Sequence, residues 1–242
     1  MSLKELMSIK TIEQFDVLSN ALRIFPERVL QLRYYALEVN DPEEGISNIE
    51  SAFREVLNQF YGMVGALKDQ GAIKTLYCHE SFNALLCLRH SIQHGSGRIK
   101  NLLRETIIDK KSLKFSEIIY SASNTEMTRV LFLINATWFE SGIKSGNYQN
   151  KWEGISTYWN LENIKKEIIK NNESWETAYI DITSLIIEAM RVLVSTYGQH
   201  FSASGGDSEV YYRHFQEVAP IDSLDSHIIY GLTNGSATSF FK

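Results

Sequence analysis

The residues best suited to chemistry lie in one short run near the middle of the chain, Arg89-His90-Ser91-Ile92-Gln93-His94. An apolar stretch, 85–88, precedes this run, and Gly95 follows it. An arginine guanidinium binds phosphate through a planar fork of N–H groups, and an imidazole with an ordinary pKa of about 6.5 takes up or releases a proton near neutral pH. Because burying an arginine is costly unless it is paired, an arginine at the end of an apolar helix indicates a specific role.

The spacing of Arg89 and His94 limits how their side chains can meet. On a regular helix, residues five apart differ in direction by about 140°, so the two side chains point to different sides. They can meet if the helix ends near Gly95 and the chain redirects His94, or if a second copy supplies one of them across a two-fold axis. We expect His90 to position or polarise the arginine. A local basic surface is expected from three further cations: Arg98, Lys100 and Arg104.

The run Leu88-Arg89-His90-Ser91-Ile92-Gln93-His94-Gly95 resembles the signature of the HEPN superfamily. That signature is an arginine, a polar residue that is often asparagine, aspartate or histidine, a few further residues and a histidine. The resemblance covers about 40–104 and 176–200. It implies a bundle of four to five helices, with the signature on a helix that follows a long amphipathic one.

The resemblance also implies an activity. Catalytic members are metal-independent endoribonucleases in which the 2′-hydroxyl attacks the adjacent phosphate, and many are toxins or antiphage defence proteins. They usually act as homodimers that combine two signatures in one site, some with a cognate antitoxin or second subunit, and no cofactor is implied. Arg89 and His94 would be the catalytic pair, with His90, Arg98 and Lys100 in substrate binding or support. Other members are inactive modules that bind RNA, nucleotide or a protein partner.

Two readings without nuclease activity remain open. Arg89 could pair with Glu80, Glu105 or another carboxylate, while His94 interacts with the carboxyl end of its helix, where a cation is favoured. A zinc site is the other reading, since Cys87, His90 and His94 fall at i, i+3 and i+7, with Cys78-His79 upstream. The chain lacks the second Cys or His pair that would complete a typical tetrahedral site.

The composition is that of an ordinary globular protein. The chain has 242 residues, of which 44% are hydrophobic and 22% charged, and its net charge is −5. The negative charge argues against extended binding of duplex nucleic acid. Two cysteines make no disulfide framework, and no apolar run approaches the roughly 20 residues of a membrane span. We therefore expect a cytoplasmic protein with reduced thiols, no signal peptide and no membrane partner.

Helices are expected to position the Arg89–His94 run. Asp41-Pro42-Glu43-Glu44 is a helix start, with Asp41 as the cap, Pro42 at the first position and Glu44 completing a capping box. Apolar residues then recur every three or four positions from Ile49 to Leu67, Tyr61 among them. A second helix is expected over 80–94, and a third over 176–197.

Other segments are less regular. The pattern predicts a short helix over 12–22 that Pro26 ends, followed by a second apolar-periodic segment over 27–39. Residues 115–120 and 130–134 are rich enough in β-branched and aromatic side chains for strands, although the second run also fits a buried helix. An exposed, lysine-rich helix is expected over 161–170.

The predicted architecture is mainly α. We expect residues 1–201 to form a helical bundle of the HEPN kind, with four to five core helices. An insertion at about 105–170 interrupts it, and the pattern leaves that insertion open between helix and strand. Residues 202–242 are expected to form a C-terminal extension that packs on the body or on a partner.

Overall fold

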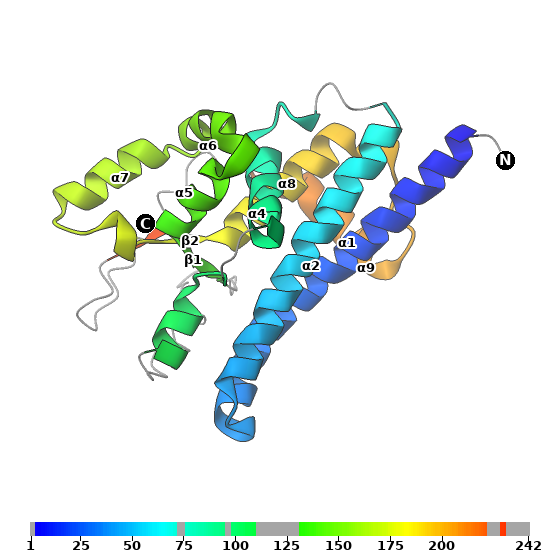
Figure 1. Ribbon diagram of the computed structural model, residues 1–242. Coiled ribbons are helices and arrows are strands. Elements are labelled where there is room, and N and C mark those ends of the chain that lie inside the picture. The colour runs from blue at the N-terminus through cyan, green and yellow to red at the C-terminus, as the bar shows by residue number, and fades with distance from the viewer. Residues whose placement is uncertain (1–2, 72–75, 95–97, 110–130, 222–227, 231–242) are drawn as a thin grey trace.

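The computed structural model describes residues 3–71, 76–94, 98–109, 131–221 and 228–230. This part of the chain is mainly helical, with one small three-stranded sheet (Figure 1). The α-helices are α1 (Leu3–Tyr34), α2 (Pro42–Asp69), α4 (Glu80–His94), α5 (Ala136–Lys144), α6 (Trp152–Tyr158), α7 (Leu161–Lys170), α8 (Ile182–Tyr197) and α9 (Gly206–Glu217). Shorter π and 3₁₀ turns are η1 (Tyr35–Val39), η2 (Arg104–Asp109), η4 (Gly146–Lys151), η5 (Trp175–Thr177) and η6 (Gly198–His200). The strands are β1 (Leu133–Asn135), β2 (Tyr179–Asp181) and β3 (Ile228–Ile229). The predicted mainly α fold is confirmed.

Helices α1 and α2 form a long antiparallel hairpin whose joined end projects from the rest of the molecule (Figure 1). The prediction that Pro26 ends a helix was wrong, because α1 continues through this residue to Tyr34. A proline removes one backbone hydrogen bond from a helix. Here Phe25, Val29 and Leu32 are buried on both sides of that position, so packing along the hairpin outweighs the lost bond.

The predicted start of α2 is confirmed. Asp41 Oδ1 accepts a hydrogen bond from Glu44 N at 3.0 Å, and Pro42 occupies the first helical position. The apolar stripe of the helix is buried from Ile46 to Leu67, whereas Tyr61, predicted to belong to the stripe, is 51% exposed. Tyr61 therefore lies at the edge of the packed face.

Helix α4 occupies the centre of the molecule. It packs against α2, α5, α6 and α8, and every residue from Ser81 to Leu88 is buried. A helix that is apolar all round must be covered on all sides. The predicted boundaries of this helix are confirmed.

The sheet joins the helices through its two longer strands. β1 pairs with β2 antiparallel, and β2 pairs with β3. Asn135, at the end of β1, caps α5 by accepting from Trp138 N, and Asp181, at the end of β2, caps α8 by accepting from Thr183 N. Because the two strands run in opposite directions, α5 and α8 leave from opposite ends of the sheet.

These elements refine the prediction for the second half of the chain. The strand alternative for 130–134 is correct in part, because a strand covers Leu133–Asn135. The helix predicted over 176–197 begins only at Ile182, after η5 and β2. Within the predicted insertion, the described residues are largely helical, and α7 matches the helix expected over 161–170. The predicted strand over 115–120 lies outside the described residues.

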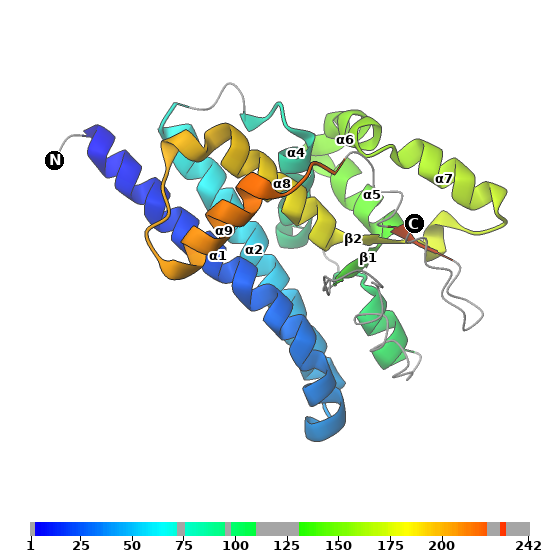
Figure 2. The ribbon, with the colours of Figure 1, turned by 180° about the vertical axis from the view of Figure 1, so that it is seen from behind.

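Helix α9 lies against α1 and α8 on the side seen in Figure 2. The ring of Tyr212 packs edge-on against Phe15 of α1 and Phe201, and its hydroxyl donates to Gly198 O at 3.3 Å. Within the predicted C-terminal extension, α9 thus packs on the helical body and β3 joins the sheet.

The expected place of Arg104 in a basic surface was wrong. Its guanidinium is buried against α2, with Nε 2.9 Å from Glu50 Oε1 and Nη1 3.5 Å from Glu43 Oε1. Asn101 completes the cluster, since its Nδ2 donates to Glu50 Oε1 at 2.8 Å and its Oδ1 accepts from Arg104 N. Arg104, rather than Arg89, is therefore the arginine whose burial an ion pair offsets, and it holds η2 to α2.

Arg104→Ala is expected to lower the free energy of unfolding by about 3 kcal/mol, because it leaves the buried carboxylate of Glu50 without its cation. Arg98→Ala is the matched control. Arg98 is exposed and forms no ion pair within the described residues, so its loss should change stability by less than about 0.5 kcal/mol. Urea unfolding of both variants measures the difference, and equal midpoints would show that the Glu50–Arg104 pair is not structural.

Candidate functional site

The Arg89–His94 run begins at the point where α4 leaves the core. After the buried residues Ser81–Leu88, Arg89 and His90 are half-buried, and Gln93 and His94 are exposed. The packing of the first half of α4 thus fixes the direction in which the polar second half emerges.

Arg89 faces α2. Its guanidinium carbon lies 4.2 Å from the centroid of the Tyr61 ring, and its Nε donates to Asn58 Oδ1 at 3.4 Å. No carboxylate of the described residues forms an ion pair with Arg89. The carboxylates considered as its partners are engaged elsewhere, Glu80 with Asn83 Nδ2 at 3.0 Å and Glu105 with the Tyr179 hydroxyl. A structural ion pair therefore does not account for Arg89 in this part of the chain.

His90 and His94 lie one turn apart on the same side of α4. Their ring centroids are 4.5 Å apart. Partial burial, together with the neighbouring His94 and Arg89, lowers the pKa of His90. The His90 ring is therefore mainly uncharged at neutral pH, and it can accept a proton.

Within the described part of the chain, no hydrogen bond or ring contact joins the two predicted catalytic residues, Arg89 and His94, and His94 still belongs to α4. Arg89 lines a small depression between α2 and α4, and neither His90 nor His94 lines it. The redirection of His94 at the end of the helix, one of the two ways in which the pair could meet, does not bring it to Arg89. The divergence expected from the five-residue spacing is therefore present in the structure.

Two residues of this site were missed from the sequence. Arg54 and Asn58 lie on α2 and line the same depression as Arg89. Asn58 Oδ1 also accepts from Gln93 Nε2 at 3.0 Å, which ties the exposed end of α4 to α2. The sequence feature that could have indicated Arg54 and Asn58 is their spacing: they lie at i and i+4, with Tyr61 at i+7, along one edge of an apolar helix.

Arg98 and Lys100 lie on the extended segment after α4. Both side chains are exposed and form no ion pair within the described residues, in contrast to Arg104. The carbonyl of Lys100 accepts from Asn135 N at 2.9 Å, so the backbone here is held beside β1.

The geometry argues against a zinc site formed by Cys87, His90 and His94. Cys87 is 1% exposed, in the core, and burial raises the pKa of its thiol to about 12, whereas His90 and His94 lie on the emerging part of α4. A thiolate is the form that binds zinc. Among the described residues, no three His, Cys, Asp or Glu side chains are placed to hold a metal ion.

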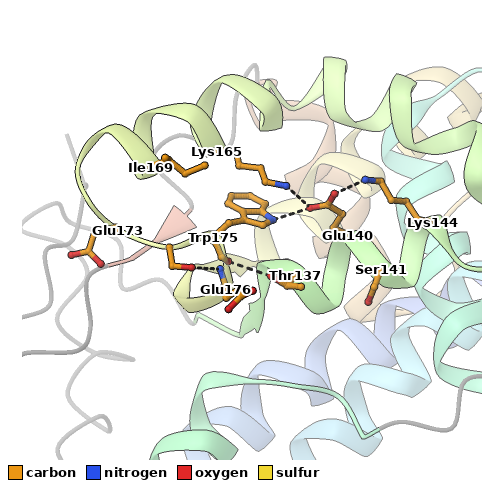
Figure 3. Close-up of a pocket in the computed structure, with 10 residues that line it drawn as sticks. Thr137, Glu140, Ser141, Lys144, Lys165, Ile169, Glu173, Trp175 and Glu176 are labelled. Atoms are coloured by element: carbon orange, nitrogen blue, oxygen red, sulfur yellow. Dashed lines mark hydrogen bonds and ion pairs between the residues drawn. The ribbon is translucent and has the colours of Figure 1, made fainter.

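A larger cleft lies elsewhere, over α5, α7 and η5 (Figure 3). Its volume is about 540 Å³. At its centre the Glu140 carboxylate contacts Lys144 Nζ, Lys165 Nζ at 3.2 Å and Trp175 Nε1 at 2.9 Å. The remaining lining residues are Thr137, Ser141, Ile169, Glu173, Ser174 and Glu176.

The charges of this cleft do not suit a phosphate. Its two ammonium groups are already paired with Glu140, and two further carboxylates line it. Burial by itself would raise the pKa of Glu140, but the hydrogen bonds and charges of Lys144 and Lys165 outweigh it, so this pKa lies below its usual value of 4.5. The cleft thus lacks the excess of positive charge found beside α4.

Comparisons with protein-family models, with curated proteins and with solved structures find no match to this chain. In the described residues, none of the helices combines the length and the apolar character needed to cross a bilayer.

Glu140→Gln is expected to lower the free energy of unfolding at pH 7 by about 1 kcal/mol, because Lys144 and Lys165 lose their counter-charge. Since the folded-state pKa of Glu140 is depressed, its stabilisation is present above the usual pKa and is lost as the pH falls through the folded-state value. Urea unfolding at pH 7 and at about pH 3 should therefore show a difference that shrinks at the lower pH. Glu162→Gln, on the exposed side of α7, is the control. A difference that persists unchanged at low pH would contradict the assignment.

Proposed function

We propose that this chain is a metal-independent endoribonuclease of the HEPN type, acting in the cytoplasm in a toxin–antitoxin or antiphage role. The observation that supports the proposal is the state of Arg89. It is half-buried and forms no ion pair with a described carboxylate, and it lies on the same polar end of α4 that carries His90 and His94. A cation without a counter-ion among the described residues, on a surface that also carries imidazoles, suits a phosphodiester.

Each residue has a defined task in the proposed reaction. His94 takes the proton of the ribose 2′-hydroxyl, whose oxygen attacks the adjacent phosphorus while the bond to the 5′-oxygen breaks. The leaving oxygen receives a proton, and the products are a 2′,3′-cyclic phosphate and a free 5′-hydroxyl. Arg89 stabilises the charge that builds up on the phosphate oxygens. His90 supports the arginine, and Arg98 and Lys100 attract the RNA backbone.

The proposed active form is a homodimer. Because Arg89 and His94 of one chain point to different sides of α4, a site that uses both needs a second copy across a two-fold axis. A cognate antitoxin or second subunit would then act by covering the emerging end of α4.

The second candidate function is a catalytically silent module that uses the same surface to bind RNA, a nucleotide or a protein partner. The separation of Arg89 from His94 within one chain favours it. The two functions differ in a single observable, the cleavage of RNA.

The first test is cleavage of end-labelled single-stranded RNA in the presence of EDTA. Arg89→Ala and His94→Ala should each reduce the rate by about 100-fold or more, because each removes a group that acts in the transition state. Arg213→Ala, an exposed arginine on α9, should leave the rate unchanged. Circular dichroism checks that the variants fold. A wild-type chain that neither cuts RNA nor arrests growth on expression would support the silent module instead.

The second test asks whether two chains form the site. Mixed after joint refolding, the Arg89→Ala and His94→Ala variants should recover about a quarter of the wild-type rate, because half of the dimers are mixed and each keeps one intact Arg–His pair. If the mixture stays as inactive as the separate variants, the two residues do not come from different chains.

A further inference from the structure

The small depression between α2 and α4 has a composition that the proposed chemistry does not by itself require. Its volume is about 60 Å³. It is lined by Arg54, Leu57, Asn58, Arg89, Ile92 and Gln93. Two arginines from different helices thus meet at one point of the surface of a chain whose net charge is −5.

Most hydrogen-bond donors of these arginines are unused within the described residues. Arg54 Nη1 donates to the Ile92 carbonyl at 3.5 Å, and Arg89 Nε donates to Asn58 Oδ1 at 3.4 Å, and both contacts are long. A guanidinium has five N–H donors. The nearest carboxylate in sequence, Glu55, accepts from Gln59 Nε2 at 2.6 Å and forms no ion pair with Arg54. Among the described residues, no carboxylate therefore balances the two positive charges of the depression.

The size of the depression limits what can enter it. About 60 Å³ is room for a few water molecules, since one needs roughly 10–15 Å³ of such volume. A single tetrahedral oxyanion is of comparable size, whereas a ribose or a base would extend beyond the depression. Asn58 already uses its Oδ1 to accept from Arg89 and Gln93, so its Nδ2 remains as a further donor to an anion.

An aromatic ring lies beside the depression. Tyr61 is 51% exposed, and Arg89 lies over its ring with 4.2 Å between the guanidinium carbon and the centroid. An RNA base of any identity can stack on an exposed ring of this kind. Phosphate and base contacts are then spaced along α2, from Arg54 through Asn58 to Tyr61.

We propose that this depression binds one phosphate group of a single-stranded RNA between Arg54 and Arg89, while Tyr61 stacks on a neighbouring base. The ligand class rests on the proposed function. Arg54 is a binding residue that fixes the register of the strand, so that the phosphodiester held by Arg89 is the one that reaches the imidazole supplied for cleavage. The depression is a binding subsite that accepts only single strands, because a base paired in a duplex cannot stack on Tyr61.

The test uses the full-length His94→Ala chain, which leaves RNA uncut, and a fluorescein-labelled single-stranded RNA of about 12 nucleotides. Fluorescence anisotropy over a range of NaCl concentrations gives the affinity and its salt dependence. Adding Arg54→Gln should weaken binding about tenfold and reduce the slope of log affinity against log salt by about 0.7, the value for one phosphate contact on a single strand. Adding Arg213→Gln should change neither quantity.

Two more variants separate charge from structure. Arg54→Lys should restore the salt slope, because it keeps the charge, but only part of the affinity, because a lysine lacks the planar fork. Tyr61→Leu should weaken binding about tenfold with the salt slope unchanged, since stacking releases no counter-ions. Thermal unfolding of each variant confirms that the fold is retained.

The outcomes distinguish this inference from the proposed function. If the wild-type chain cuts RNA but Arg54→Gln binds with unchanged affinity and slope, the subsite is wrong and the nuclease stands. If no cleavage occurs but Arg54→Gln weakens RNA binding as described, the subsite stands and the nuclease is wrong. If uridine monophosphate or inorganic phosphate binds as tightly as the RNA, the ligand is a free anion and the polynucleotide subsite is overturned.

Discussion

The complete burial of the first half of α4 determines where the polar residues at the end of this helix emerge. Residues Ser81–Leu88 are covered on every side by α2, α5, α6 and α8. A close-packed core allows little rotation or sliding of such a helix, so the direction of its polar end is set by packing rather than by any contact that the polar residues make. Arg89 therefore emerges against the Asn58 and Tyr61 edge of α2, and His94 emerges elsewhere. The same packing that positions the cation also keeps the imidazole away from it within one chain.

Two pairs of arginines in the described part of the chain differ in environment, and the environment separates their roles. Arg104 and Arg191 are largely buried and bind carboxylates directly, Arg104 that of Glu50 and Arg191 both oxygens of the fully buried Glu188. Such pairs stabilise because breaking them leaves an isolated charge in the interior. Arg54 and Arg89 instead keep part of their surface in water and pair with no described carboxylate. An incoming anion then meets donors that are not already committed, and this contrast is what separates the α2–α4 surface from the larger cleft around Glu140.

The sequence predicts an element well where its local signals agree with its packing. The cap at Asp41 and the apolar first half of α4 are of this kind, and both helices begin where expected. Prediction fails where the deciding partner is far away in sequence. Arg104 looks like a surface cation until Glu50, 54 positions earlier, is placed beside it. Pro26 was predicted to end a helix because a proline removes a backbone hydrogen bond locally. The packing along the α1–α2 hairpin, which outweighs that loss, joins residues that are far apart in the sequence. Arg54 was missed because it becomes part of a site only where α4 packs against α2.

The sheet that joins the two halves of the molecule is only a few residues long, yet it carries both helix caps. Asn135 and Asp181 end neighbouring antiparallel strands, in a register that pairs Ile134 with Ile180. Because side chains alternate along a strand, a slip of one residue would move Ile134 and Ile180 out of the main core to the other buried face, where Leu133 and Tyr179 now pack. It would also draw both capping side chains away from the helices that they begin. Helices α5 and α7, which line the large cleft, and helix α8 therefore cannot slide past one another by small steps. We expect these helices to unfold together as one cooperative unit.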